Sequence, residues 1–266
     1  MLAEVRPCVA VLLPQSSYRA DDLLAAARKL DVDLFVASDR CHVLAEEWKE
    51  GSLPLDFTDP DGAARALADA VRPREPRGVL GTDDQTAVIA AKAARLLGLP
   101  HDAPEAVEAA RNKRLSRERL RDAGVPVPWF RTVDVDGPAP GDVPFPCVVK
   151  PLVLSASRGV IRADDPASLR TALDRVGRLL RSPQVAVRRD PELTKVLVEE
   201  FLPGPEVALE GLLTRGSLQV LAIFDKPDPL DGPYFEETLY LTPSRHPPQA
   251  KTRSCGWPRT RRARSG

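Results

Sequence analysis

A lysine followed by a Ser/Gly-rich loop is the clearest candidate for chemistry in this sequence, within residues 145–161. The apolar run 147–149 predicts a short buried strand that delivers Lys150 to its end, and Pro151 is expected to stop the strand because proline has no N–H to donate. A strand is expected to resume at Gly159. The intervening loop contains Ser155, Ser157 and Gly159, whose small side chains let backbone N–H groups close over an anion. This order predicts a lysine and a phosphate-covering loop, although the same combination also arises by chance in α/β proteins.

A second candidate group combines carboxylates, an apolar pair and a Pro-Gly-Pro turn. Glu199 and Glu200 are followed by Phe201 and Leu202, and Glu206 comes directly after the turn. Backbone N–H and C=O groups beside the apolar pair suit the edge and faces of a purine, and Glu206 could accept hydrogen bonds from ribose hydroxyls. The alternative is a strand with solvated glutamates and a proline turn.

Lysine is scarce in this chain, which contains 30 Arg but only 8 Lys. A lysine beside a loop is therefore informative, because its compact charge can reach a phosphate where a planar guanidinium does not fit. Lys113 follows Asn112 at the junction of two predicted helices. It is a further candidate for phosphate contact, with a solvated helix-end lysine as the alternative.

Composition narrows the classes of partner and compartment. Acidic and basic residues balance at 38 each, so charge favours neither a nucleic-acid nor a membrane partner. No run approaches the roughly 18 apolar residues of a membrane span, and no signal peptide is recognised, so we expect a cytoplasmic protein. Scattered cysteines favour buried thiols over a disulfide or metal site; they are Cys8, Cys41, Cys147 and Cys255.

The first hundred residues alternate between apolar strands and amphipathic helices. The predicted strands are 8–13, 33–37, 53–57 and 78–80, and the predicted helices are 21–30, 61–71 and 85–97. This alternation predicts an α/β fold with a doubly wound parallel sheet. Ligands meet such sheets at the carboxyl ends of strands, where Ser38-Asp39 and Thr82-Asp83-Asp84 lie, although Asp83 or Asp84 could simply cap the next helix. No Gly-x-Gly-x-x-Gly follows the first strand, which disfavours the usual dinucleotide fold.

The remaining segments predict a different, α+β architecture with antiparallel strands. Predicted helices are 104–112, 113–123 and 165–180, and predicted strands are 130–135, 147–150, 196–200, 206–213 and 218–224. Pro104 is expected to be the first residue of its helix, and 214–217 should form a hairpin turn between the last two strands.

Taken in order, these motifs resemble the ATP-grasp superfamily. The matching segments are Asn112-Lys113, Val148-Val-Lys150-Pro151, Ser155-Ala-Ser-Arg-Gly159 and Glu199-Glu-Phe-Leu-x-Gly-x-Glu206. They are most similar to carboxylate–amine ligases that join amino acids or dipeptides, the group around carnosine synthase. The resemblance implies a Rossmann-like pre-ATP-grasp domain at 1–100 and two α+β ATP-grasp subdomains at 101–194 and 195–244, the last of which is incomplete. Residues 245–266, which fall outside the resemblance, are expected to form a basic, disordered tail.

The resemblance also implies roles for individual residues. Lys113 and Lys150 would contact the nucleotide phosphates, and Lys226 would add a third contact. The mobile loop over the γ-phosphate would consist of Ser155, Ala156, Ser157, Arg158 and Gly159, of which Ser157, Arg158 and Gly159 would act with Lys226 in the catalytic step. Glu236 or Glu237 would shape the substrate site. For these glutamates and for Lys226, solvated loop charge is the alternative.

The adenine and ribose would be held by the second group of motifs. Glu199, with the backbone of Glu200 and Leu202, would read the amino edge of adenine, while Phe201 would pack nearby and Glu206 would hold the ribose. The implied reaction transfers a phosphoryl group from ATP to a small-molecule carboxylate, and an amine then attacks the acyl phosphate. Mg²⁺ would bridge the phosphates.

The sequence departs from the family beyond its last predicted strand. ATP-grasp enzymes carry metal-binding acidic residues there, whereas from Thr242 onward this chain has no Val, Ile, Leu, Asp or Glu. We therefore expect that this chain has no metal ligands, and that its C-terminal part is frameshifted or truncated. Turnover should then be impaired, and the last strands should leave an exposed edge prone to homo-oligomerisation. A basic tail that binds an acidic surface is an alternative. Two other functions stay open: a purine-biosynthesis or carboxylase-type enzyme, and a non-catalytic ATP-binding remnant or regulator.

Overall fold

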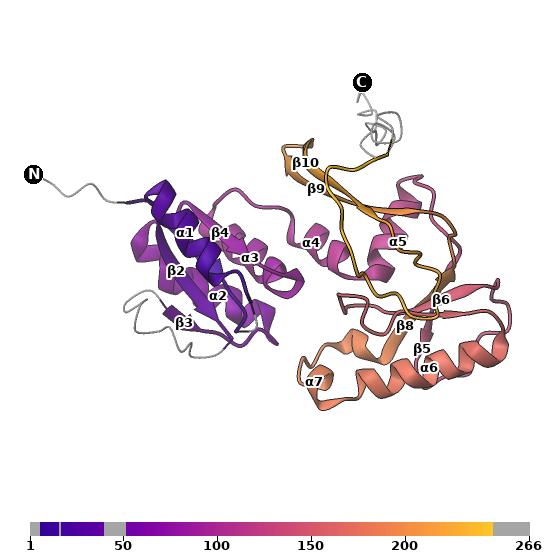
Figure 1. Cartoon of the computed structure of the whole chain (residues 1–266). Coiled ribbons are helices and arrows are strands. Elements are labelled where there is room, and N and C mark those ends of the chain that lie inside the picture. Colours follow the sequence, from indigo (N-terminus) through magenta and orange to yellow (C-terminus); the bar gives the residue numbers. More distant parts are fainter. Residues whose placement is uncertain (1–5, 16, 40–51, 247–266) are drawn as a thin grey trace, which may run out of the picture. The chain divides into compact units, whose positions relative to one another are not determined.

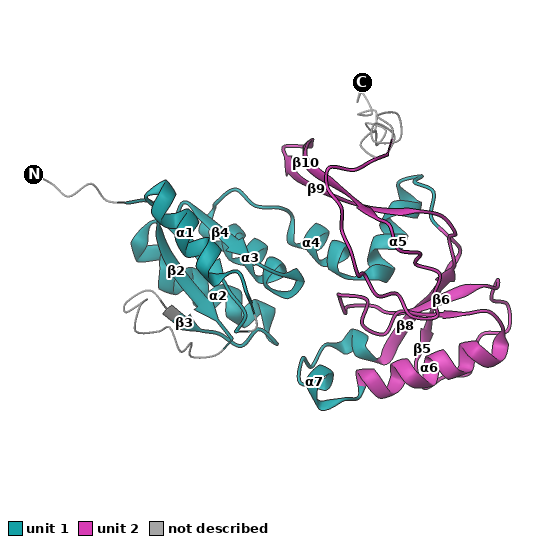
Figure 2. Ribbon diagram, viewed as in Figure 1, with its two compact units in different colours: residues 1–127, 181–193 teal, residues 128–180, 194–266 magenta. Residues whose placement is uncertain are grey.

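The computed structural model describes residues 6–15, 17–39 and 52–246 (Figure 1). The chain divides into two compact units, one formed by 1–127 with 181–193 and the other by 128–180 with 194–266 (Figure 2). The division into domains that the sequence suggested stays a prediction. Most of the expected basic tail, residues 247–266, lies outside the described residues.

Unit 1 contains a parallel four-stranded sheet of order β3-β2-β1-β4. Its strands are β1 (Cys8–Leu12), β2 (Asp33–Ser38), β3 (Ser52–Pro54) and β4 (Gly78–Gly81). β3 is shorter than the expected 53–57: its last paired residue is Pro54, and the N–H of Leu55 makes one more hydrogen bond to the carbonyl of Ser38 (2.8 Å). Leu55 and Phe57 are buried in the hydrophobic core. The parallel arrangement confirms the α/β prediction for this part of the chain.

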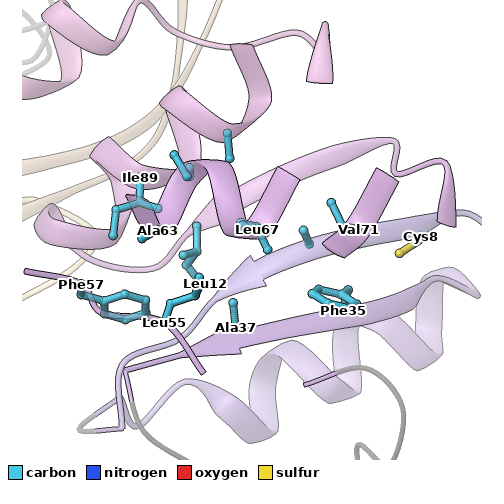
Figure 3. Packing of buried hydrophobic residues seen from close by; sticks show 14 residues of the cluster. Cys8, Leu12, Phe35, Ala37, Leu55, Phe57, Ala63, Leu67, Val71 and Ile89 are labelled. Atoms are coloured by element: carbon cyan, nitrogen blue, oxygen red, sulfur yellow. The ribbon is translucent and has the colours of Figure 1, made fainter. Parts of the chain in front are cut away.

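Helices cover both faces of this sheet, namely α1 (Ala20–Leu30), α2 (Pro60–Val71) and α3 (Asp84–Leu97). The core cluster joins Leu12 and Phe35 of the sheet to Leu67 of α2 and Ile89 of α3 (Figure 3), whereas α1 packs against β2 from the other side. Apolar burial of this kind is the main source of stability for such a layered fold.

The end of β4 shows why a strand-end carboxylate is not by itself a ligand site. Asp83 caps α3: its side chain accepts a hydrogen bond from the backbone N–H of Thr86 (2.8 Å), and the Thr86 hydroxyl accepts from the Asp83 N–H (3.0 Å). The reciprocal bonds form a capping box that satisfies two otherwise unpaired helix donors. The capping alternative is therefore confirmed for Asp83.

Two further helices, α4 (Pro104–Arg111) and α5 (Lys113–Asp122), complete unit 1 together with 181–193, which includes α7 (Pro183–Ala186). Arg111 forms an ion pair with Asp190, and Arg114 forms one with Glu192 at 3.0 Å. The side chains of these pairs are at most 25% exposed, so they are shielded from water more than surface pairs are. They connect segments almost 80 residues apart.

Unit 2 is built on an antiparallel sheet of order β5-β8-β6-β7. Its strands are β5 (Phe130–Asp134), β6 (Cys147–Pro151), β7 (Ile161–Ala163) and β8 (Lys195–Glu200). Helix α6 (Pro166–Leu180) packs along β6 and β7 through an apolar stripe (Figure 1), which consists of Leu169, Ala172, Leu173, Val176 and Leu180.

Two expectations about the ends of β6 and β7 are wrong. β6 continues through Pro151, because β7 pairs only with 147–149 and the proline has a single neighbouring strand there. β7 begins at Ile161 rather than at Gly159, because the N–H of Val160 donates to the carbonyl of Ser157 within the loop (3.1 Å).

A long antiparallel hairpin follows, formed by β9 (Glu206–Thr214) and β10 (Ser217–Lys226). Residues 215–216 form the expected turn. Beyond β10 the chain returns to both sheets of unit 2, because Tyr234 bridges to Ile161 and Leu241 bridges to Asp225. Unit 2 therefore has the antiparallel α+β character that was predicted.

Two of the four cysteines lie in the described part of the chain, and both are buried free thiols. Burial raises the pKa of Cys147 to about 11, and burial also raises the pKa of Cys8. Cys41 and Cys255 lie outside the described residues. Among the described helices, none has the length and apolar character needed to cross a membrane.

Candidate active site

Lys150 and Glu199 form an ion pair on neighbouring strands of unit 2. Lys150 pairs in register with Leu197 of β8, and Val148 pairs with Glu199, so both charged side chains lie on the same face of the sheet. Glu199 is only 4% exposed and the Lys150 side chain 23%. A carboxylate at this depth needs charge-assisted hydrogen bonds, and Lys150 supplies one. Two residues predicted to bind nucleotide thus meet at one point.

The Ser/Gly loop has an unusual backbone. Ala156 and Ser157 both have left-handed φ values, 54° and 52°, and Gly159 follows with 75°. Non-glycine residues rarely take this conformation, and consecutive examples are commonly associated with functional loops. Gly159 is also required by space, because an added Cβ would lie 2.8 Å from Leu179 Cδ2 and 2.9 Å from Pro151 Cγ. The loop therefore has a defined shape at the end of β6.

A cavity of about 760 Å³ lies between this loop, the second half of α6 and the segment 234–238. Its wall includes two cationic side chains, Arg158 and Arg175, and two carboxylates, Glu236 and Glu237. Apolar contact is supplied by residues such as Leu179 and Phe235. A cavity of this size with a few polar groups is typical of small-ligand sites, and the mixed charges suit a ligand that carries both signs.

Lys226 links this cavity to the hairpin. It lies opposite Glu206 in the β9–β10 register, forms an ion pair with it, and forms a second ion pair with Glu237 at 2.6 Å. Burial opposes the charge on Lys226, but hydrogen bonds from its ammonium to the two glutamates outweigh burial and raise its pKa. The same hydrogen bond, with one from Tyr240, lowers the pKa of Glu237. Lys226 is therefore a partly buried cation with a cavity-lining carboxylate beside it.

The backbone is held by hydrogen bonds at the last residue of β8, Glu200, and at the next residue, Phe201. The N–H of Glu200 donates to the carbonyl of Trp129 (2.9 Å), and the N–H of Phe201 donates to that of Pro146 (3.0 Å). The Phe201 ring lies 6.4 Å from the ring of Phe235, whereas Leu202 is 64% exposed. These contacts fix the segment predicted to meet adenine and connect it to the cavity wall.

Comparison with known proteins identifies the fold and the family. Residues 143–254 match the ATP-grasp domain and residues 24–101 match the ATP-grasp N-terminal domain. The chain belongs to the ATP-grasp family. The first match contains the candidate site of unit 2, and the second contains strands β2, β3 and β4 of the unit 1 sheet.

Three relatives illustrate the range of ATP-grasp proteins that this chain resembles. It is 30% identical to the alanine–anticapsin ligase of Bacillus subtilis (strain 168) over 172 residues, 58% of this chain and 35% of that protein. It is 26% identical to the formate-dependent phosphoribosylglycinamide formyltransferase of Burkholderia pseudomallei (strain 668) over 202 residues, which are 73% of this chain and 50% of that protein. The solved L-amino acid ligase of Bacillus licheniformis has 24% identity and a TM-score of 0.71, covering 93% of this chain and 57% of that one, which supports the fold. The chain spans half or less of the length of the two curated relatives.

Lys113 belongs to unit 1, whereas the other predicted ATP-grasp site residues belong to unit 2. It is the first residue of α5, directly after Asn112, which is 1% exposed and accepts hydrogen bonds from the N–H groups of Arg114 (3.0 Å) and Leu115 (3.2 Å). This cap fixes the helix start that carries the lysine. Its contact with a nucleotide stays a prediction.

The magnesium expected of an ATP-grasp protein has no ready-made site in the described part of the chain. No three His, Cys, Asp or Glu side chains gather there at one point. Mg²⁺ often binds through phosphates with one or two carboxylates, but Glu237 is already paired with Lys226. The described carboxylates do not by themselves form a magnesium site, and the ion stays a prediction.

Several site residues were missed from the sequence. Arg175 lines the cavity from α6, and its guanidinium lies 4.8 Å from the centre of the Tyr234 ring. The Tyr240 hydroxyl donates to Glu237, and its ring lies 5.5 Å from Lys226 Nζ. A single arginine in an amphipathic helix carries no local signal. The spacing of Tyr240 three residues after Glu237 is the one clue that the sequence offered.

Proposed function

We propose that this chain carries the nucleotide and acid sites of an ATP-dependent carboxylate–amine ligase of the amino-acid or dipeptide type. Its substrates would be a small carboxylate and a small amine. The likeness to an alanine–anticapsin ligase and to an L-amino acid ligase supports this choice within the ATP-grasp family.

One observation carries the proposal: Glu237 lines the cavity and also pairs with Lys226, which pairs with Glu206. Glu206 is the residue assigned to the ribose and Lys226 the one assigned to a phosphate. A chain of charged contacts thus runs from the proposed nucleotide residues to a cavity of about 760 Å³ that could hold the acid. Phosphoryl transfer requires the nucleotide and the acceptor carboxylate to lie close together.

In the first step an oxygen of the substrate carboxylate forms a bond to the γ-phosphorus of ATP, and the bond from that phosphorus to the β,γ-bridging oxygen breaks. ADP leaves and an acyl phosphate remains. In the second step the amine forms a bond to the acyl carbon, phosphate leaves, and the amine nitrogen loses a proton to solvent. Lys150 and Lys226 would attract the phosphates, each by roughly 4 kcal/mol for a charge pair at about 4 Å in an effective dielectric near 20, before desolvation is counted.

The loop around Ser157 would limit the access of water to the acyl phosphate. Hydrolysis of that intermediate competes with amine attack, so a loop that closes over the site raises the share of productive turnover. The raised pKa of Lys226 keeps its ammonium charged at neutral pH, as a phosphate contact requires.

The test is ADP formation by the full chain with ATP and magnesium, measured over a panel of amino acids supplied singly and in pairs. We expect ADP formation that requires a carboxylate and is lost in Lys226→Met, which keeps a long side chain but removes the charge. Lys195→Met, which alters an exposed lysine of β8, is the matched control. ADP formation that is the same with and without any carboxylate contradicts the proposal.

A second candidate is a purine-biosynthesis-type ATP-grasp enzyme, favoured by the likeness to a phosphoribosylglycinamide formyltransferase over 73% of this chain. The panel therefore includes formate with phosphorylated ribosyl amines, and activity confined to these would favour this candidate. Tight ATP binding without ADP formation on any mixture would favour a non-catalytic ATP-binding protein.

We also propose that the chain self-associates in the cytoplasm, where ATP is supplied. Four exposed leucines of the hairpin support association with a second copy, namely Leu212, Leu213, Leu218 and Leu221. Sedimentation should report a mass that rises with protein concentration and falls in Leu213→Lys. A monomer at all concentrations contradicts this.

A further inference from the structure

Arg162 on β7 makes contacts in two directions. Its guanidinium carbon lies 4.4 Å from the centre of the Phe201 ring. The edge of the same guanidinium donates to the carbonyl of Asp231 (2.8 Å) and to the carboxylate of Asp164 (2.8 Å). Its backbone N–H donates to the carbonyl of Pro233 (2.8 Å). One residue thus touches the proposed adenine segment on one side and the segment 231–233 on the other.

The segment 231–234 is shaped to lie against Arg162. Gly232 has a φ of 90°, which side chains rarely permit, and an added Cβ would lie 2.8 Å from Arg162 Cβ. The next residues continue the contact, because Tyr234 bridges to Ile161. Two features thus fit this segment to Arg162: the left-handed backbone of Gly232 and the close approach of the segment to β7.

The segment held by Arg162 continues directly into the cavity wall. Residues 234–238 supply one side of the cavity, including Glu236 and Glu237. Displacement of 231–233 would therefore move the carboxylates that face the cavity. Phe201 approaches the same segment through Phe235 as well, at 6.4 Å between ring centres.

We propose that Arg162 is a positioning residue that couples nucleotide binding at Phe201 to the placement of the cavity wall at 231–238. The inference rests on the proposed function for its nucleotide. A ligand that orders the Phe201 ring also orders the guanidinium stacked on it, and the guanidinium edge transmits this order to the Asp231 carbonyl. Arginine suits this role because its planar group can stack on a ring while its edge donates hydrogen bonds, whereas a lysine ammonium offers no plane.

The experiment is hydrogen exchange of the full chain, read by mass spectrometry at 197–202 and 231–238, with and without ATP and magnesium chloride. Wild type is compared with Arg162→Ala, Arg162→Lys and Gly232→Ala. The matched control is Arg178→Ala, which removes an exposed arginine of α6 in the same unit. Gly232→Ala disturbs the contact from the opposite side and leaves the arginine in place.

Without ligand, exchange at 231–238 should be about tenfold faster in Arg162→Ala than in wild type, because a charge-assisted hydrogen bond and a stacking contact are lost. ATP should slow exchange at 197–202 in every variant. It should slow exchange at 231–238 in wild type and Arg178→Ala only. Arg162→Lys keeps the charge and should still lose the effect of ATP on 231–238.

Unchanged ligand-free exchange in Arg162→Ala, or ATP protection of 231–238 that survives in it and in Gly232→Ala, would overturn the inference. A wild type in which ATP slows neither segment would overturn the proposed nucleotide site and the coupling with it. The comparison without ligand distinguishes failure of the nucleotide site from failure of the Arg162 contact, because it reports whether Arg162 holds the cavity wall even when no ATP binds.

Discussion

Gly159→Ala should destabilise the connection between β6 and β7 by more than a backbone effect alone. The left-handed φ of 75° makes any side chain unfavourable by about 1–2 kcal/mol. The new methyl would also lie 2.8 Å from Leu179 Cδ2 and 2.9 Å from Pro151 Cγ, and overpacking of this kind costs about 1–3 kcal/mol. We expect a total loss of roughly 2–5 kcal/mol.

The structure offers a matched control in Gly216→Ala. Gly216 has a φ of 77° and connects two antiparallel strands, β9 and β10, but an added Cβ would meet no atom within 4 Å. This variant should therefore show the backbone effect alone, about 1–2 kcal/mol.

Native-state hydrogen exchange gives the free energy of opening for the strands that each glycine connects, β6 with β7 and β9 with β10. The loss at Gly159 should exceed that at Gly216 by about 1–3 kcal/mol. Equal losses would refute the reasoning, because they would mean that Leu179 and Pro151 move aside without cost. The loop would then have no fixed shape over the cavity.

Three further predictions concern single side chains. The hydrogen bond from Lys226 keeps the pKa of Glu237 below 4.5. The stabilisation that the ionised Glu237 contributes is therefore complete above that pH and is lost as the pH falls through the folded pKa. Glu237→Gln should flatten the dependence of the melting temperature on acid pH, and an unchanged dependence contradicts this. Cys147, with a pKa of about 11, should react with iodoacetamide at about pH 8 only after unfolding in urea, and equal labelling of native and unfolded chain would be contrary evidence. Asp83→Ala should weaken α3 by about 1 kcal/mol, more than Asp84→Ala does, when helix amide exchange is compared; identical effects would deny the cap.

Much of the fold could be read from local patterns. The buried run in 33–37 and the buried stripe of α6 follow the geometry of the strand or helix itself, so the local sequence pattern reports them. Strand ends were less predictable, because they depend on neighbours. Pro151 stays in β6 since β7 does not reach it, and no property of the proline itself reveals that.

The candidate site was only partly predictable for the same reason. Lys150 and Glu199 were singled out separately, but their pairing depends on the register of β6 against β8. Arg162 and Arg175 gave no signal, because their significance lies in contacts with residues distant in sequence. The contact of Arg162 with Asp231, for example, spans 69 positions.

The contact of residues 181–193 with α4 and α5 likewise could not be predicted from the sequence. It rests on Arg111 with Asp190 and Arg114 with Glu192, pairs 79 and 78 positions apart. In the sequence, each of these four charged residues is what one expects on a solvated surface. Only the folded chain shows that their charges are largely shielded from water and paired.

The most direct test of the central claim is calorimetric titration of ATP with magnesium into the full chain, into Lys150→Ala and into the control Lys195→Ala. We predict saturable binding to wild type and control, and affinity at least about tenfold weaker in Lys150→Ala, because a charge-assisted phosphate contact is worth about 1.5–3 kcal/mol. No saturable binding to a folded wild type, or equal affinity in Lys150→Ala, would contradict the assignment of this site to ATP.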